Sequence, residues 1–358
     1  MRMLLAGGGT GGHLFPAVAL AQRLLEQDPD AQVLFVGTER GLEARLLPEL
    51  GLPLQTIDIR GLVGKDLSAK LALVPKLAKS MAQSRGIIKG FKPDVVVGVG
   101  GYASGPVLLA AQMMKVPTLI HEQNAWPGLT NRMLARWADR VCLSFPEADR
   151  AFHLGRTMLT GNPLRKGMDD CPPLPKGKPS LLVFGGSQGA RAINDAMLEA
   201  LPVLEKLKGK LSIVHQTGEA DCERIADGYR QAGWEGAEVV PFIHDMAAAY
   251  AAAHLVVSRA GATTIAELTA CGRPALLIPY PHAAGGHQAA NAESLARNGA
   301  AMLLPQADLG GGRFAGLLRD LLDDRKLLEG MSRSAAGLGR RGASDTILKE
   351  CRRLAGKG

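Results

Sequence analysis

The fold of this chain is decided by the stretch Met3-Leu4-Leu5-Ala6-Gly7-Gly8-Gly9-Thr10-Gly11-Gly12-His13. Its apolar start predicts a buried strand, its glycines predict a tight turn, and the Ala/Leu-rich residues from Pro16 onward predict a helix. Glycine suits such a turn because it adopts positive φ and leaves the backbone open to a ligand. Free N–H groups at the start of the helix point at the turn, which predicts a site for an anion.

By itself, the glycine turn allows more than one ligand. Gly7, Gly9 and Gly12 fit the G-x-G-x-x-G pattern of dinucleotide-binding proteins. Glu39 follows the next predicted strand, where such a protein places its ribose ligand. A nicotinamide oxidoreductase is therefore one interpretation of this stretch.

The opening pattern recurs in the second half of the chain. Residues 180–191 repeat the strand, turn and helix start, and strands alternate with helices in both halves. This alternation predicts an α/β protein with two doubly wound parallel-sheet domains, whose strand ends enclose a cleft. Because a Pro- and Gly-rich segment at 171–179 separates the halves, we predict one domain at 1–162, joined by a C-terminal helix at 340–358, and a second at 163–339.

Composition argues against several classes of protein. No apolar run reaches the ~18 residues that a membrane span needs, and no secretory signal precedes the first glycine turn. The five cysteines lack C-x-x-C spacing, so we expect no metal site, no disulfide framework and a reducing cytoplasm. The absence of a Walker motif argues against phosphoryl transfer through a P-loop.

The net charge of +8 is concentrated in one segment. Residues 60–92 hold eight basic residues and one acidic residue. Nucleic acid is a poor partner because the segment has a single aromatic residue, Phe91, and lacks stacking platforms. Two interpretations remain: an ordinary amphipathic helix, or contact with an anionic membrane in which Leu73, Val74 and Leu77 insert.

Two further segments place polar residues at the ends of predicted strands. His121-Glu122-Gln123-Asn124 follows a strand predicted at 116–120, and residues 258–267 turn from a strand into a helix. Ligands of open α/β sheets bind at this edge. Backbone amides, with the hydroxyls of Ser187 and Thr263 or Thr264, would hold phosphates there, while the carboxylate of Glu267 suits a ribose diol.

Six motifs, in order along the chain, resemble the MurG family of bacterial N-acetylglucosaminyltransferases within glycosyltransferase family 28. They are Gly-Gly-Thr-Gly-Gly-His at 8–13, Gly-Gly-Tyr-Ala-Ser-Gly-Pro at 100–106, His-Glu-Gln-Asn at 121–124, Gly-Asn-Pro-Leu-Arg at 161–165, Gly-Gly-Ser-Gln-Gly-Ala-Arg at 185–191 and Arg-Ala-Gly-Ala-Thr-Thr at 259–264. The resemblance implies a GT-B fold of two Rossmann-like domains. It also implies conversion of lipid I to lipid II without a cofactor, with UDP-N-acetylglucosamine bound by the C-terminal half and lipid I by the N-terminal half.

The resemblance further implies roles for individual positions. Arg165 and Ser187 would meet the donor near its diphosphate, and the backbone of Ile243 would read the uracil. Glu267 would take the ribose hydroxyls, and the sugar would meet Gln288, Asn124 and the loop Thr10-Gly11-Gly12. The phosphates would accept hydrogen bonds from backbone amides of the segment Ala262, Thr263, Thr264, Ile265 and Ala266. One departure is visible, because Gly285-Gly286 stands where the family often carries acidic or amide residues before the His-Gln pair.

The family's reaction inverts the anomeric carbon and needs a base for the acceptor hydroxyl. We expect His13 to be that base, because the helix dipole at its position disfavours imidazolium, and Glu122 is the second candidate. The enzyme would lie peripherally on the cytoplasmic face of the inner membrane, where other cell-wall synthesis proteins are conceivable partners. Three alternatives stay open: another UDP-sugar transferase with a lipid acceptor, the nicotinamide oxidoreductase, and a carrier that binds UDP-N-acetylglucosamine without turnover.

Overall fold

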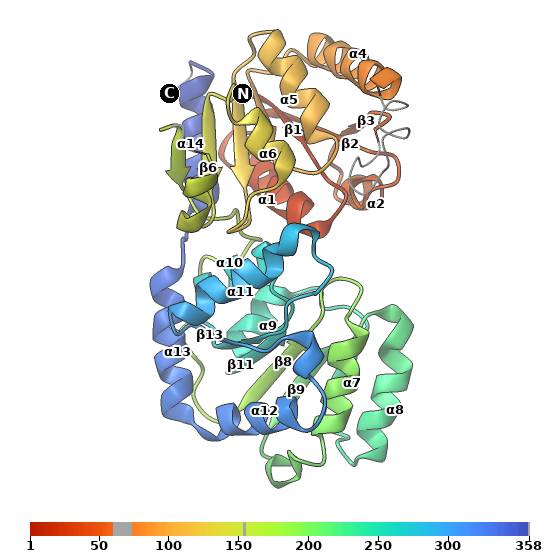
Figure 1. The fold of residues 1–358 in the computed structure, drawn as a ribbon, viewed down its shortest axis with the longest axis vertical. Helices are drawn as coiled ribbons and strands as arrows, with labels where there is room; N and C mark the ends of the chain where they lie inside the picture. The colour runs from red at the N-terminus through yellow and green to blue at the C-terminus, as the bar shows by residue number, and fades with distance from the viewer. Residues whose placement is uncertain (60–73, 153–154, 357–358) are drawn as a thin grey trace. The chain divides into compact units, whose positions relative to one another are not determined.

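The computed structural model describes residues 1–59, 74–152 and 155–356. By its internal contacts the chain divides into two compact units (Figure 1). Unit 1 comprises Met1–Leu164 with Gly342–Gly358, and unit 2 comprises Arg165–Arg341. These boundaries lie two residues beyond those expected from the sequence, at 162 and 339.

Unit 1 is built on a parallel sheet with the strand order β3-β2-β1-β4-β5-β6-β7. The strands are β1 Arg2–Ala6, β2 Gln32–Gly37, β3 Leu54–Thr56, β4 Val95–Gly98, β5 Thr118–Glu122, β6 Arg140–Leu143 and β7 Thr157–Leu159. One core packs the sheet against α1 Gly11–Gln27, α2 Glu43–Glu49 and α14 Ala343–Leu354. The other packs it against α4 Val74–Phe91, α5 Ser104–Met113 and α6 Leu129–Leu134.

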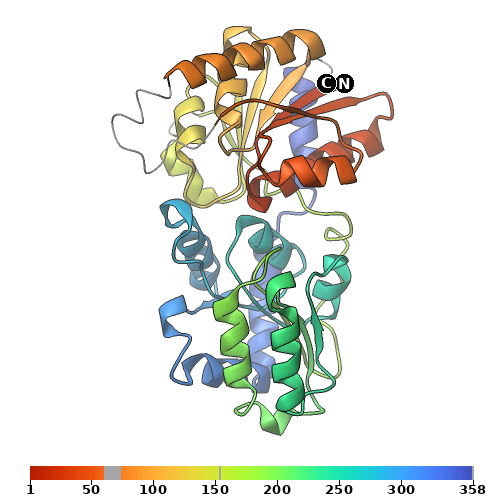
Figure 2. The ribbon, with the colours of Figure 1, turned by 90° about the vertical axis from the view of Figure 1, so that its right-hand side faces the viewer.

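The C-terminal helix α14 is part of unit 1 although it ends the chain. It lies against α1 (Figure 2), and its buried Ile347 and Cys351 enter the core that α1 also lines. Nε of Arg23, on α1, donates to Asp345 at 2.6 Å, and Nε of Arg140, on β6, donates to Glu350 at 2.5 Å. Burial of apolar side chains therefore stabilises the packing of α14 on unit 1, and the ion pairs orient the helix.

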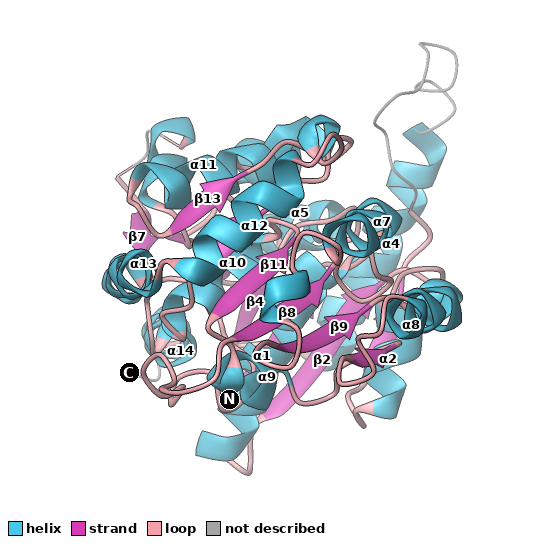
Figure 3. Ribbon diagram, turned by 90° about the horizontal axis from the view of Figure 1, so that it is seen from below, coloured by secondary structure: helices cyan, strands magenta, loops and turns pink. Residues whose placement is uncertain are grey.

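Unit 2 repeats this design with the strand order β10-β9-β8-β11-β12-β13. Its strands are β8 Ser180–Phe184, β9 Ser212–Gln216, β10 Glu238–Val240, β11 Leu255–Ser258, β12 Ala275–Leu277 and β13 Ala301–Leu303. Its helices are α7 Arg191–Ala200, α8 Cys222–Gln231, α9 Met246–Ala252, α10 Ala262–Ala270, α11 His287–Arg297, α12 Arg313–Asp323 and α13 Arg325–Leu338. Figure 3 shows β8 between β9 and β11, just as β1 lies between β2 and β4 in unit 1.

Three predicted elements have different bounds in the structure. The strand expected at 116–120 is shifted to Thr118–Glu122, because His121 and Glu122 continue the ladder by pairing with Cys142 and Leu143 of β6. The apolar alternation of residues 54–59 also predicts a strand, and that strand stops at Thr56 because its partner β2 ends at Gly37. The amphipathic helix expected in the basic segment has a sequence pattern that runs from residue 67 to residue 90. The structure describes it as α4 from Val74 onward, and residues 60–73 lie outside the described part.

Candidate active site

The first glycine turn joins β1 to α1 at the carboxyl edge of the sheet. Gly7, Gly8 and Gly9 have φ values of 149°, 143° and 88°, which glycine adopts more readily than other residues. Thr10 is the N-cap of α1 but its side chain makes no capping hydrogen bond. The first N–H groups of a 17-residue helix are thus directed at this turn, as an anion or a sugar oxygen would require.

A second glycine turn, after β4, packs directly on the first. A Cβ atom on Gly101 would lie 2.5 Å from the carbonyl oxygen of Gly8, and one on Gly7 would lie 2.5 Å from that of Gly100. The imidazole of His13 lies above Gly100, where a Cβ atom would come within 3.0 Å of the ring. The two turns therefore form one backbone surface that carries His13.

Behind this surface is a buried carboxylate that the sequence did not single out. Glu43, at the start of α2, accepts hydrogen bonds from the N–H of Gly9 at 2.7 Å and from the N–H and hydroxyl of Thr38, both at 2.9 Å. A dinucleotide fold was expected to use Glu39, which is exposed instead. Because Glu43 already takes the N–H of Gly9, this turn lacks that donor for a pyrophosphate.

Of the polar segment at the end of β5, His121, Glu122 and Gln123 are buried, and the Glu122 carboxylate accepts four hydrogen bonds. Glu122 accepts from the N–H of Asn124 at 2.9 Å, the N–H of Gly128 at 3.1 Å, and the side-chain amides of Asn124 at 3.2 Å and Asn131 at 2.8 Å. The carboxylate thereby shapes the loop that presents Asn124, a half-buried residue. Asn131 is a second residue that sequence reasoning missed, since it lies nine positions away on α6.

Two histidines and a glutamine connect this segment to the first turn. Gln123 lies between His121 and His13, with its side-chain oxygen 3.1 Å from Nδ1 of His13 and its nitrogen 3.1 Å from Nδ1 of His121. Burial lowers the pKa of His121 to about 4, so this ring is neutral at physiological pH.

In unit 2, the turn after β11 leads into α10, which begins beyond the extended N-cap Gly261 without a side-chain cap. Ala262, Ile265 and Glu267 are buried, while Thr264 and Ala266 are half-buried. The hydroxyl of Thr263 is buried in a residue only 9% exposed and has no hydrogen-bond partner within the described residues. A buried donor without a partner is costly, so this hydroxyl suits a ligand oxygen.

Arg165 and Glu267 are brought together from positions 102 residues apart. The guanidinium donates two hydrogen bonds to the carboxylate, Nε to Oε1 at 2.6 Å and Nη2 to Oε2 at 2.8 Å. Burial opposes the charge of Arg165, but the charge and hydrogen bonds of Glu267 outweigh it and raise the pKa of the guanidinium. Two hydrogen bonds from one guanidinium fix the orientation of the Glu267 carboxylate.

The remaining predicted donor residues lie on other loops of unit 2. Ser187 is exposed in the turn after β8, and Ile243 is half-buried between β10 and α9. Gln288 is half-buried in the first turn of α11 and accepts from the N–H of Tyr280 at 2.9 Å. Just before it, Gly285 and Gly286 adopt left-handed φ values of 61° and 68°, which glycine accommodates without strain.

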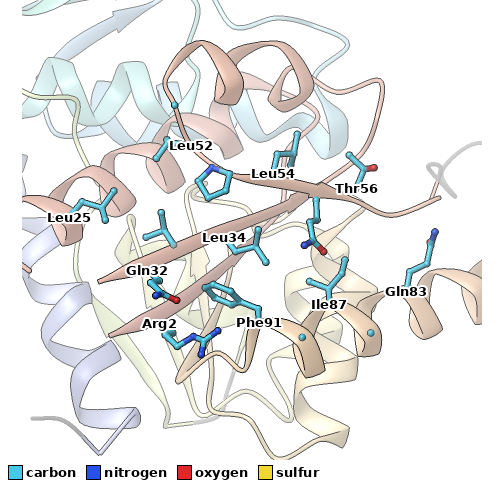
Figure 4. A pocket seen from close by; sticks show the side chains of 16 residues that line it. Arg2, Leu25, Gln32, Leu34, Leu52, Leu54, Thr56, Gln83, Ile87 and Phe91 are labelled. Carbon is cyan, nitrogen blue, oxygen red and sulfur yellow. The ribbon is translucent and has the colours of Figure 1, made fainter. Parts of the chain in front are cut away.

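A separate cavity of about 1,100 Å³ in unit 1 contains none of the predicted site residues (Figure 4). It lies beside β1, β2, β3 and the second half of α4, and Arg2 stacks over Phe91 at its wall. Arg2 and Gln32 open β1 and β2, so this wall lies at the amino end of the strands. The predicted site residues lie at the opposite, carboxyl edge, where open α/β sheets bind ligands.

Comparison with known proteins identifies the family of both units. The glycosyltransferase family 28 N-terminal domain matches residues 3–143, and the C-terminal domain of the same family matches residues 180–347. The chain is 63% identical, over the full length of both proteins, to the UDP-N-acetylglucosamine–N-acetylmuramyl-(pentapeptide) pyrophosphoryl-undecaprenol N-acetylglucosamine transferase of Syntrophotalea carbinolica. It is 49% identical to the protein of that name from Geobacter sulfurreducens, with 98% of each chain covered.

A solved structure shares the fold of the whole chain. The crystal structure of Acinetobacter baumannii MurG superimposes with a TM-score of 0.80 at 35% identity, covering 98% of this chain and 99% of that one. The fold expected from the sequence, GT-B with two parallel-sheet domains, is thereby confirmed. Both domain models, the full-length relatives and the shared fold lead to one assignment: the chain is a member of glycosyltransferase family 28.

Proposed function

We propose that this enzyme transfers N-acetylglucosamine from UDP-N-acetylglucosamine to the 4-hydroxyl of the muramyl sugar of lipid I, forming lipid II. The observation that carries the proposal is the 63% identity, over its full length, to a transferase named for this donor and acceptor. The alternative within the family is a UDP-sugar transferase that acts on a different lipid acceptor.

Unit 2 supplies groups that match the donor. The amino end of α10 suits the diphosphate, as does the hydroxyl of Thr263, which has no partner in the part of the chain that the structure describes. Ser187 adds a hydroxyl from the turn after β8. Glu267, held by Arg165, suits the ribose diol. The backbone of Ile243 would read the uracil, and Gln288 would contact the sugar. When UDP departs, the helix dipole and Arg165 stabilise the negative charge that develops on the diphosphate.

Unit 1 supplies the acceptor site and the base. Thr10, Gly11 and Gly12, at the N-cap and start of α1, would offer N–H groups to the reacting sugar, and Asn124, which follows β5, would also contact it. His13 removes the proton from the attacking hydroxyl as that oxygen forms the bond to the anomeric carbon and UDP leaves from the opposite face. Glu122 is the alternative base, but the four hydrogen bonds that it already accepts from Asn124, Gly128 and Asn131 favour His13.

Label transfer from radioactive UDP-N-acetylglucosamine to a lipid I analogue tests the reaction. We expect transfer by the wild type and a fall in kcat of about 100-fold or more in His13→Ala, with both substrates saturating, since general bases contribute about 10²–10⁴. Glu39→Gln is the control, because the oxidoreductase interpretation needs that carboxylate and the transferase does not. Donor binding without transfer would identify a carrier instead, and near-normal kcat in His13→Ala would exclude His13 as the base.

We also propose that unit 1 binds the cytoplasmic face of the membrane peripherally, because lipid I is held in the bilayer by its undecaprenyl chain. Lys76, Lys79, Arg85, Lys89 and Lys92 of the basic segment are exposed, as is Leu77. Arg60, Lys65, Lys70 and Leu73 lie outside the described residues, and the side chain of Val74 is not described. In the described part of the chain, no helix is both long and apolar enough to span a bilayer.

Exposed apolar side chains on α5, α6 and their flanking loops are further evidence for a membrane-binding surface on unit 1. Met113, Trp126, Leu129, Met133 and Trp137 are each 51–61% exposed. α5 packs on α4, and α6 packs on α5, so these side chains lie on elements that continue from the basic helix. Aromatic and apolar residues beside basic ones are typical of proteins that bind the membrane interface.

Cosedimentation with vesicles that contain anionic lipid tests this surface. Lys76→Glu with Lys89→Glu is expected to weaken binding about 30-fold or more, since each lysine near an anionic surface contributes about 1 kcal/mol. The matched control is Lys206→Glu with Lys210→Glu, which changes the net charge equally but on unit 2. Equal loss of binding in both double variants would refute a specific surface on unit 1.

A further inference from the structure

The side-chain amide of Gln123 is buried between two histidines and the backbone of the second glycine turn. Gln123 is 1% exposed and follows directly after β5. Its amide makes four contacts: to Nδ1 of His13, to Nδ1 of His121, and to the carbonyl oxygens of Val99 and His121. No other part of the proposed mechanism uses this residue.

The carbonyl contacts fix which way the amide points. The nitrogen of the amide lies 2.9 Å from the oxygen of Val99 and 3.2 Å from that of His121, and carbonyl oxygens only accept hydrogen bonds. The –NH₂ group must therefore face them. The amide oxygen then faces Nδ1 of His13 at 3.1 Å, and because this oxygen is only an acceptor, Nδ1 must carry the proton.

The second histidine is consistent with the same orientation. Nε2 of His121 lies 3.1 Å from the carbonyl oxygen of Gly161 and donates to it, so Nδ1 is the bare nitrogen of the neutral ring. That bare nitrogen accepts from the amide of Gln123 at 3.1 Å. The –NH₂ group of Gln123 thus shares its two protons among three acceptors, the oxygens of Val99 and His121 and Nδ1 of His121. The amide oxygen of Gln123 accepts from Nδ1 of His13.

We infer that Gln123 is a positioning residue that holds the neutral His13 ring in the tautomer with a proton on Nδ1 and a bare Nε2. This inference rests on the proposed role of His13 as the base. A neutral imidazole has a single acceptor nitrogen, and the tautomer decides which edge of the ring removes a proton. An amide fixes this choice without placing a negative charge beside the ring, which would favour imidazolium.

Nitrogen NMR of the imidazole rings measures the tautomer directly and does not depend on activity. We expect His13, assigned by the signal that His13→Ala removes, to show a protonated Nδ1 and an unprotonated Nε2 in the wild type at pH 8. The wild-type spectrum alone can overturn the inference, because a dominant Nε2–H tautomer contradicts it. A wild type with the expected tautomer but no transfer would overturn the proposed function instead.

Gln123→Met keeps the length of the side chain but removes the acceptor. In this variant we expect an Nε2–H population at His13 and a fall in kcat of about tenfold or more, with KM for UDP-N-acetylglucosamine within about twofold of the wild type. Gln112→Met is the matched control, since the one hydrogen bond of the Gln112 side chain among the described residues is a long contact of 3.4 Å to the carbonyl oxygen of Leu134. An unchanged tautomer in Gln123→Met, whatever its kcat, would refute the positioning role.

Discussion

The pair formed by Arg165 and Glu267 allows a quantitative test of the interior of unit 2. Glu267 is 1% exposed and the side chain of Arg165 is 33% exposed, and two hydrogen bonds join them. Glu267→Gln removes the negative charge with little change of shape. The variant leaves a guanidinium, two-thirds buried, against a neutral amide.

The size of the effect follows from burial. Removing one partner from a fully buried pair costs about 3–5 kcal/mol, and exposed pairs contribute about 0–1 kcal/mol. Since a third of the Arg165 side chain still reaches water, we expect Glu267→Gln to lower the free energy of unfolding by about 2–3 kcal/mol. Arg165→Met should cost about the same, and the double variant little more than either, giving a coupling energy of about 2 kcal/mol.

Urea unfolding of the wild type, the two single variants and the double variant measures this coupling. The spectroscopic signal must come from unit 2 alone. Trp234 is buried in unit 2, whereas the other two tryptophans, Trp126 and Trp137, belong to unit 1. Replacing those two by Phe leaves the fluorescence of Trp234 as the probe.

The control cycle uses a pair of the same chemistry on the surface of the same unit. On α11, Nη2 of Arg297 lies 2.7 Å from Oε2 of Glu293, and the two side chains are 70% and 53% exposed. Their coupling should be about 0.5 kcal/mol or less. If the coupling of Arg165 with Glu267 is no larger than this, the argument from burial is wrong.

Three further predictions concern single residues. Thr263→Val should leave the free energy of unfolding unchanged or higher, because the hydroxyl has no partner among the described residues, yet raise the KM for UDP-N-acetylglucosamine about tenfold in steady-state assays. Gly101→Ala should lower the free energy of unfolding of unit 1 by about 2 kcal/mol or more in urea unfolding. The reason is that its Cβ atom would lie 2.5 Å from backbone at a φ of 79°. The control is Gly86→Ala, in a helix with open space, which should raise the free energy of unfolding by about 0.5–1 kcal/mol. Burial lowers the pKa of His215 to about 3, so between pH 6.5 and 3 the unfolded chain binds a proton that the folded chain does not. Below pH 6.5, His215 should therefore lower the free energy of unfolding of unit 2 by about 1.4 kcal/mol per pH unit. Unfolding curves at pH 7 and 5 measure this, and His215→Gln should lose less stability between the two pH values than the wild type.

The local patterns predicted the parallel α/β halves because they depend on neighbours in the sequence. An apolar run, a glycine turn and a helix start lie within a dozen residues, and the structure places β1 and α1 there, with β8 and α7 in the second half. Where a prediction depended on a partner strand it was less accurate, as the shift of β5 shows. That strand ends at Glu122 because β6 extends its ladder, which the sequence around residue 120 does not reveal.

By itself, the sequence determined the α/β class, the duplication and, through six ordered motifs, the resemblance to glycosyltransferase family 28. The comparisons confirmed this family. Only the tertiary structure decided which side chains meet. Glu43, and not Glu39, accepts the N–H of Gly9 in the first turn, and the side chain of Gln123 contacts His13, 110 positions away in the sequence. The physical reason is that a hydrogen bond depends on distance and direction in space. Those are set by how strands and helices pack, so residue type and spacing alone leave them open.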